Sequence, residues 1–61
     1  MFVQLETFRI GSRIRITRGQ LTGLTGVVAM MSDDNSNCVL TIDGWETGVY
    51  LSMRCDMLSS E

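Results

Sequence analysis

The chain has 61 residues, which is enough for one small domain, and its hydrophobic fraction of 44% excludes a disordered tail. No apolar run approaches the ~20 residues that span a bilayer and no signal peptide is visible, so we expect a cytoplasmic protein with no membrane partner. The net charge of −2 and the absence of lysine count against a generic binder of nucleic-acid backbones, which is expected to be basic.

The charge is unevenly placed along the chain. Residues 1–31 carry four arginines against one glutamate, a balance of +3. Residues 32–61 carry six acidic residues against one arginine, a balance of −5. The basic first half therefore contains a local arginine patch, which consists of Arg13, Arg15 and Arg18.

Residues for catalysis or metal binding are scarce. The chain has no histidine, which excludes histidine-based dyads and triads, and it has no lysine-containing phosphate loop. Cys38 and Cys55 permit one disulfide or remain two buried thiols, and the lack of a secretory signal favours thiols. Two cysteines alone do not complete a zinc site, and Asp33 and Asp34 lack the spacing of a calcium loop. We therefore expect no enzyme activity, cofactor, metal or small-molecule substrate.

The first part of the chain predicts a strap followed by a strand. Residues 1–10 are apolar and weakly patterned, which fits a short strand, a strap across a barrel end or a partly ordered terminus. Near 12–18, isoleucines alternate with polar residues at the period of a half-buried strand. The outward arginines form either a solvated face or a cationic patch, and the pattern alone favours the solvated face. The predicted inward residues are Ile14 and Ile16, and the outward ones are Arg13, Arg15 and Thr17.

A loop at 19–23 and a strand near 25–32 come next. Glycines begin and end the loop, which indicates positive φ or a close chain approach. Leu21, between them, is either an exposed contact or a cover for the barrel end. The strand is a continuous apolar run, and we expect its two methionines at 30 and 31 to fill the core. Gly26 near its start predicts a bulge or a strong coil.

The second half predicts three more strands joined by polar turns. Asp43-Gly44 is a hairpin signal, and residues 59–61 are expected to fray. Five short strands without a helix-length periodic segment give an all-β fold, and a small closed or partly open barrel removes sheet edges. The strands are predicted near 38–43, 48–53 and 55–58, with turns at 32–37 and 43–48.

The glycine spacing resembles the KOW motif. Eight positions over eighteen, from Gly11 to Val28, agree with it in residue class, and VLTIDGWETGVYLSM resembles the third and fourth strands of the same domain. The motif occurs in the C-terminal domains of the transcription elongation factors NusG and Spt5 and in ribosomal proteins. The resemblance covers residues 11–58 and implies a five-stranded SH3-like barrel. It also implies that the glycines of the motif are structural, and that Gly26 is the most characteristic of them. The glycines concerned are Gly11, Gly19, Gly23 and Gly26.

The resemblance also implies a binding surface on two loops, between strands one and two and between strands three and four. We therefore expect a non-catalytic interaction module, related to transcription or translation, that binds a protein partner. Trp45 is the most distinctive residue there: it is a hot spot, a platform for a nucleic-acid base or a cover for the barrel end. The residues that the resemblance assigns to the surface are Gln20, Leu21, Thr22, Asp43, Gly44, Trp45 and Glu46.

Two alternatives to a protein-binding module remain open. The first is RNA or DNA binding through Arg13, Arg15 and Arg18, which predicts an affinity that falls steeply with salt. The second is a structural homo-oligomer, because a small barrel with strand edges gains stability by self-association.

Overall fold

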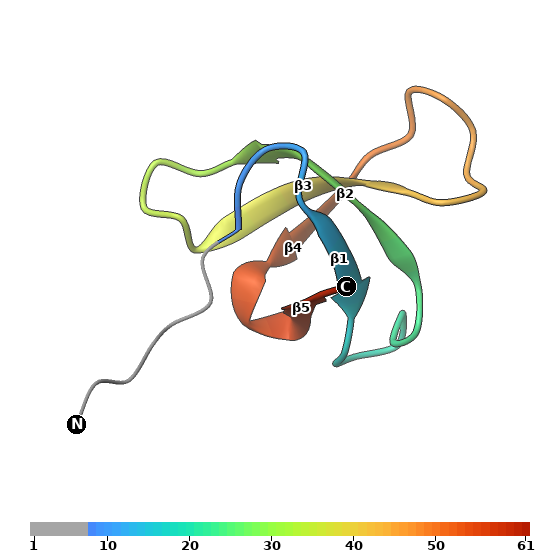
Figure 1. The fold of residues 1–61 in the computed structure, drawn as a ribbon, viewed down its shortest axis with the longest axis horizontal. Helices are drawn as coiled ribbons and strands as arrows, with labels where there is room; N and C mark the ends of the chain where they lie inside the picture. The colour runs from blue at the N-terminus through green and yellow to red at the C-terminus, as the bar shows by residue number, and fades with distance from the viewer. Residues whose placement is uncertain (1–7) are drawn as a thin grey trace.

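A computed structural model describes residues 8–61 as a five-stranded, all-β barrel (Figure 1). The strands are short, and a single turn of 3-10 helix, η1, precedes the last one. No helix in this described part of the chain is long and apolar enough to cross a membrane. The elements are β1 (Arg13–Ile16), β2 (Thr25–Met31), β3 (Asn37–Ile42), β4 (Leu51–Arg54), η1 (Cys55–Met57) and β5 (Leu58–Ser60).

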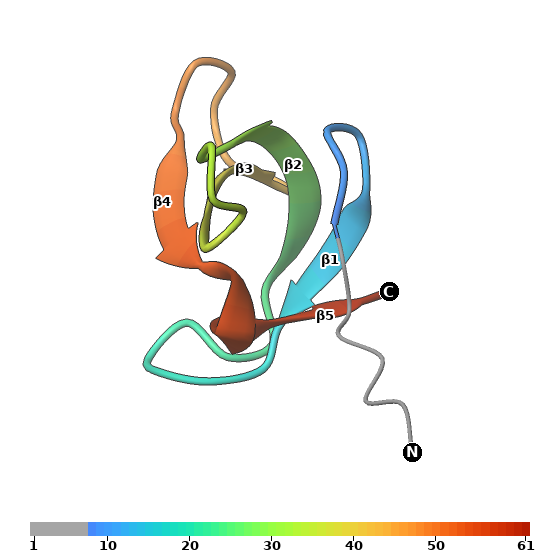
Figure 2. The same ribbon diagram turned by 90° about the vertical axis from the view of Figure 1, so that its left-hand side faces the viewer.

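All strands belong to one antiparallel sheet with the order β4-β3-β2-β1-β5. The sheet bends so strongly that β4 and β5, its two edges, are joined by η1 (Figure 2). β5 then returns along β1, where Leu58 pairs with Ile16 and Ser60 with Ile14. This curl confirms the predicted small SH3-like barrel and leaves one enclosed core.

Inward positions of the strands supply that core. Ile14 and Ile16 are completely buried, whereas Arg13 and Arg15 between them are exposed, which confirms the predicted alternation in β1. The same alternation in β3 buries every second residue. The core consists of Phe8, Ile14, Ile16, Val28, Cys38, Leu40, Ile42 and Leu58.

Gly26 lets β2 and β3 cross closely at the bend of the sheet. It pairs with Ile42 and is buried, and a Cβ placed on it would collide with the carbonyl group of Thr41. Gly26 therefore permits this close approach, but the bulge is elsewhere: the register between β2 and β3 shifts between Val28 and Met30. The absence of a Cβ at Gly26 leaves room for the backbone of β3. The extra residue of the bulge follows three positions later in β2.

Several predicted boundaries and faces were wrong. The fourth strand begins at Leu51 rather than near 48, and η1 replaces most of the last strand predicted at 55–58. Residues 59–61 do not fray, because Ser59 and Ser60 pair with β1 and the Glu61 N–H donates to the Arg13 carbonyl oxygen at 3.2 Å. Met31 packs on the core, but Met30 is 62% exposed, because the bulge turns it outward.

The predicted strap at residues 1–10 lies mostly outside the described residues. Phe8, the first described residue, is only 5% exposed and belongs to the core. A tight turn follows, in which the Ser12 N–H donates to the Arg9 carbonyl oxygen at 2.9 Å and the Arg9 N–H to Ser12 Oγ at the same distance. β1 begins directly after this turn.

Candidate interaction site

The loop between β3 and β4 is the longest continuously exposed stretch of the described chain. We call residues 43–50 the β3–β4 loop; all eight are solvent-exposed. It projects from the barrel at the upper right of Figure 1, in orange, away from the enclosed core. A segment this exposed is not needed to fill the core, so its composition is free to serve another purpose.

Two consecutive turns give the β3–β4 loop its shape. The Trp45 N–H donates to the Ile42 carbonyl oxygen at 3.1 Å, and the Val49 N–H donates to that of Glu46 at 3.2 Å. Gly44 and Gly48 have φ values of +86° and +90°, a region in which residues with a Cβ are strained. The predicted Asp43-Gly44 turn is therefore confirmed, and a second turn, which was not predicted, delays the start of β4.

Three large apolar side chains lie on this loop. Trp45 is 40% exposed, Val49 42% and Tyr50 59%, and none of them belongs to the buried core. The exposed part of the Trp45 indole is therefore available for contact with another molecule. Exposed aromatic residues on one loop are typical of a contact surface, because their apolar area is available at little entropic cost.

Sequence reasoning missed Val49 and Tyr50 as members of this surface. It placed both residues in the strand predicted near 48–53. The second glycine of the loop, Gly48, was the available signal, because its positive φ closes the second turn just before them.

The loop between β1 and β2, which was predicted to share the surface, is built differently. Leu21 packs against the core and so covers the barrel end, while Gln20 and Thr22 are exposed. The Thr22 hydroxyl donates to the Gly19 carbonyl oxygen at 2.7 Å and stiffens the loop. In both views this loop lies at the bottom and the β3–β4 loop at the top, so the structure does not bring the two predicted halves together (Figures 1 and 2).

Asp43, the first residue of the β3–β4 loop, anchors that loop to the barrel. Its carboxylate accepts hydrogen bonds from the Arg13 guanidinium and the Thr25 hydroxyl, both at 2.6 Å to Oδ2. The bond with Arg13, followed by that with Thr25, lowers the pKa of Asp43 below its ordinary value. The carboxylate is therefore engaged within the protein, whereas Gly44, Trp45 and Glu46 lie beyond the anchor.

The predicted arginine patch is partly neutralised. Arg13 also contacts Glu61 Oε2 at 3.1 Å, so two carboxylates surround its guanidinium, and the hydrogen bond to Asp43 is the main cause of its raised pKa. Arg15 lines a shallow pocket together with Glu61. Neither Arg15 nor Arg18 forms an ion pair within residues 8–61. The cationic surface is thus smaller than the sequence implied.

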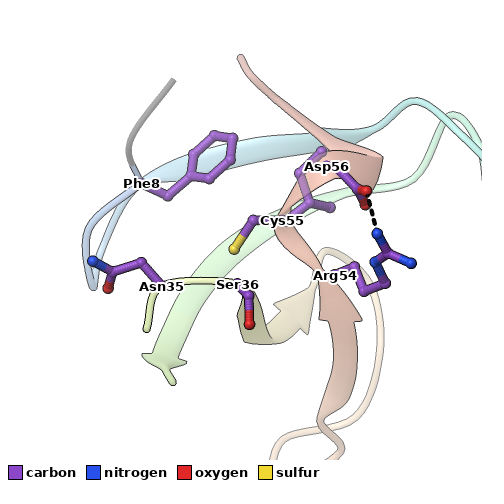
Figure 3. Close-up of a pocket in the computed structure, with 7 residues that line it drawn as sticks. Phe8, Asn35, Ser36, Arg54, Cys55 and Asp56 are labelled. Carbon is purple, nitrogen blue, oxygen red and sulfur yellow. Dashed lines mark hydrogen bonds and ion pairs between the residues drawn. The ribbon is translucent and has the colours of Figure 1, made fainter. Parts of the chain in front are cut away.

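A second hollow lies beside η1, at the edge of the core. It has a volume of about 440 Å³ and is lined by Phe8, the β2–β3 turn and η1 (Figure 3). Arg54 and Asp56 form an ion pair at 2.7 Å on its rim. Cys55 contributes its sulfur to the lining, and both Cys38 and Cys55 are free thiols. Across the described chain, no three His, Cys, Asp or Glu side chains are grouped to hold a metal ion.

These features define a small SH3-like barrel that carries an exposed aromatic loop. No family model matches the sequence, and no curated protein matches it either. The fold is similar to that of a chain in the crystal structure of the MjSpt4:Spt5 complex (conformation B), with a TM-score of 0.83 and 12% sequence identity. The similarity covers 98% of this chain and 41% of that one, so the protein spans less than half of the matched chain. The predicted KOW-type fold is thereby confirmed.

Proposed function

We propose that this protein is a non-catalytic interaction module that binds a protein partner through the β3–β4 loop. Trp45 is the central anchor, and Tyr50 and Val49 extend the apolar surface. A barrel fixed by its own core presents this loop, so partner binding requires no rearrangement of the sheet. By resemblance, we place the module in transcription or translation.

The observation that carries this proposal is the group of three exposed apolar side chains on one loop. Trp45, Val49 and Tyr50 are not members of the buried core, and exposing their apolar surface to water has a cost that a partner would remove. The fold similarity to a chain of a complex between two proteins agrees with a role in protein binding. Gly44 and Glu46 belong to the same surface, whereas Gln20, Leu21 and Thr22 would contact only a partner large enough to reach the other end of the barrel.

The nucleic-acid alternative has less support. Arg13 is held by two carboxylates, which leaves Arg15 and Arg18 as its main cationic groups, in a chain with a net charge of −2. Two free arginines supply few phosphate contacts, so any such binding is expected to be weak and to disappear at moderate salt.

The test uses the tagged protein to capture partners from a nuclease-treated extract of its native cell. A captured protein is then purified, and its affinity is measured by calorimetry against the wild type and against W45A and Y50A. We expect W45A to weaken binding by about 30-fold or more, as loss of a hot spot does. L21A is unsuitable as a binding test because Leu21 packs on the core.

M30A is the matched control, because Met30 is also exposed and apolar but lies on β2. It should leave the affinity unchanged. Equal affinities for W45A and the wild type would overturn the proposal. Capture that occurs only from an extract without nuclease and depends on Arg15 and Arg18 would favour the nucleic-acid alternative, and sedimentation that changes with concentration would favour a homo-oligomer.

A further inference from the structure

Two thiols lie in contact at the boundary between the core and the η1 pocket. The Sγ atoms of Cys38 and Cys55 are 2.7 Å apart. Cys38 is completely buried in the core, whereas Cys55 is partly exposed and lines the pocket. Figure 3 shows the Cys55 sulfur directed between Phe8 and Ser36. One sulfur is thus accessible from outside, and the other lies directly behind it.

The sheet register explains why these two residues meet. Cys38 on β3 pairs with Met53 on β4, and Cys55 follows Met53 by two residues, so all three lie on the same face of the sheet. The Cys55 N–H donates to the Ser36 carbonyl oxygen at 2.8 Å, which extends the β3–β4 ladder by one step. Diagonal neighbours on one face are within reach of each other, and the turn into η1 at Cys55 brings its sulfur inward.

We propose that Cys55 and Cys38 form a reversible dithiol–disulfide site that takes a low-molecular-weight disulfide as its oxidant, with Cys55 as the attacking thiol and Cys38 as the resolving thiol. The pocket of about 440 Å³ gives such a molecule access to Cys55. This site is separate from the β3–β4 loop and does not depend on the proposed partner-binding function.

The chemistry balances in two exchange steps. The Cys55 thiolate attacks one sulfur of the small disulfide RSSR, forms a mixed disulfide and expels RS⁻, which takes up the proton that Cys55 lost. The Cys38 thiolate then attacks Cys55 Sγ and expels the second RS⁻, which takes up the Cys38 proton. The protein loses two hydrogens and two electrons, and RSSR is reduced to two RSH.

The environments of the two sulfurs set the order of these steps. Burial, together with the hydrogen bond to Cys55, raises the pKa of Cys38 to about 12. Cys38 therefore keeps its proton as long as Cys55 has not formed a mixed disulfide. Cys38 is 0% exposed and does not line the pocket, whereas Cys55 does. The exposed thiol is therefore the one that meets the oxidant, and the buried one acts only after it.

The disulfide would tie β3 to the start of η1. It would close a loop over residues 38–55, which includes the β3–β4 loop, and cross-links of that size restrict the unfolded chain. We expect oxidation to lower the unfolding equilibrium constant by roughly 100-fold. By linkage, the equilibrium constant for forming the disulfide should be larger in the folded chain than in the unfolded chain by the same factor.

The experiment exposes the reduced full chain to oxidised glutathione, stops the reaction by alkylation and reads the products by mass spectrometry. The chain has five arginines and no lysine, so trypsin releases residues 19–54 with Cys38 and residues 55–61 with Cys55. We expect these two peptides to be joined by a disulfide. When the chain is unfolded in urea, the equilibrium constant for forming the disulfide should be roughly 100-fold smaller. Less disulfide should therefore form at the same ratio of oxidised to reduced glutathione.

Two matched variants test the order of attack. Cys38→Ala should accumulate one glutathione on residues 55–61, because nothing resolves the mixed disulfide. Cys55→Ala should react at Cys38 at least about 10-fold more slowly. If Cys38→Ala does not fold, the early time course of the wild type replaces it, with the transient glutathione adduct expected on residues 55–61. Disulfides between molecules, no linkage in the folded chain, equal yields in water and urea, or first modification at Cys38 would each overturn the proposal.

Discussion

The guanidinium of Arg13 and the carboxylate of Asp43 lie 2.6 Å apart, and their contact joins β1 to the base of the β3–β4 loop across β2. Thr25 on the intervening strand donates to the same carboxylate oxygen. Glu61 binds the other side of the Arg13 guanidinium, so the C-terminal end of the chain belongs to the same cluster. The loop that carries Trp45 is thus fixed at its base and exposed along its length.

We expect the Asp43→Ala substitution to loosen the base of the β3–β4 loop more than it destabilises the fold. The pair is half-exposed, and exposed ion pairs contribute little to global stability. The backbone amides of Gly44 and Trp45 should exchange hydrogen faster in D43A, while the urea midpoint changes only slightly. Glu46→Ala, which removes an exposed carboxylate without a hydrogen bond within residues 8–61, should leave this exchange unchanged.

A double-mutant cycle separates the Arg13 contact from the Thr25 contact. Because Arg13 and Asp43 interact directly, the effect of D43A on loop exchange should be smaller in an R13A background. Additive effects would show that the 2.6 Å contact does not restrain the loop. Raising the salt concentration should also weaken the effect of R13A, since exposed charges are screened.

Acid should destabilise the fold between about pH 5 and pH 2. Three hydrogen bonds to Asp34 Oδ1, from the Ser36 hydroxyl, the Ser32 hydroxyl and the Ser36 N–H, lower the pKa of Asp34 to about 2 from its ordinary value of 3.8. Asp43 has a lowered pKa as well. The unfolded chain therefore takes up protons at a higher pH than the folded chain, so stability that is complete above pH 5 is lost as pH falls through these values.

The measurement is the urea midpoint as a function of pH for the wild type, D34A and D33A. Asp33 lies next to Asp34 but accepts no hydrogen bond from the described residues, so D33A serves as the matched control. D34A should flatten the pH dependence, and D33A should follow the wild type. Identical slopes for all three proteins would contradict the role given to the Asp34 hydrogen bonds.

The Gly26→Ala substitution should be among the most damaging small changes in this protein. The added Cβ would overlap the Thr41 carbonyl group, which is backbone of the paired strand and is not free to move aside. We expect a loss of more than about 3 kcal/mol in the free energy of unfolding, comparable to the whole stability of so small a domain.

Gly11→Ala is the matched control for Gly26→Ala. Gly11 has a φ of +93° but open space around it, so alanine adds backbone strain without a collision. This should cost about 1–2 kcal/mol. Urea titrations followed by circular dichroism at 25 °C would compare the two variants. A loss in G26A no larger than in G11A would show that the close approach of β2 and β3 is not what requires this glycine.

The sequence predicted those features that local periodicity determines. Alternation predicted the inward isoleucines of β1, and the count of short strands without a helix predicted the barrel. Prediction from the sequence failed where contacts between residues far apart in the chain determine the structure. The contact between Arg13 and Asp43 spans 30 positions, and it depends on a register that no short pattern encodes. Met30 looked like a core residue because nothing in the sequence showed that the bulge would turn it outward.

The same distinction applies to the candidate site. Sequence reasoning placed Leu21 and Trp45 on one predicted surface, because the resemblance assigns both loops to it. Packing separates them: Leu21 packs against the core, whereas Trp45 is 40% exposed. Tyr50 was assigned to a strand because the second turn of the loop was not predicted. That turn depends on the positive φ of Gly48, which residue type alone does not determine.

Leu21→Ala and Trp45→Ala should therefore separate stability from binding. L21A removes a side chain that packs on the core, and we expect it to cost about 1–3 kcal/mol. W45A removes an exposed side chain and should cost less than about 1 kcal/mol. Circular dichroism in urea measures both losses. As the single tryptophan, Trp45 in the wild type should also be readily quenched by acrylamide in the folded state. A larger loss in W45A than in L21A, or a protected indole, would mean that Trp45 covers the barrel end and is not available to a partner.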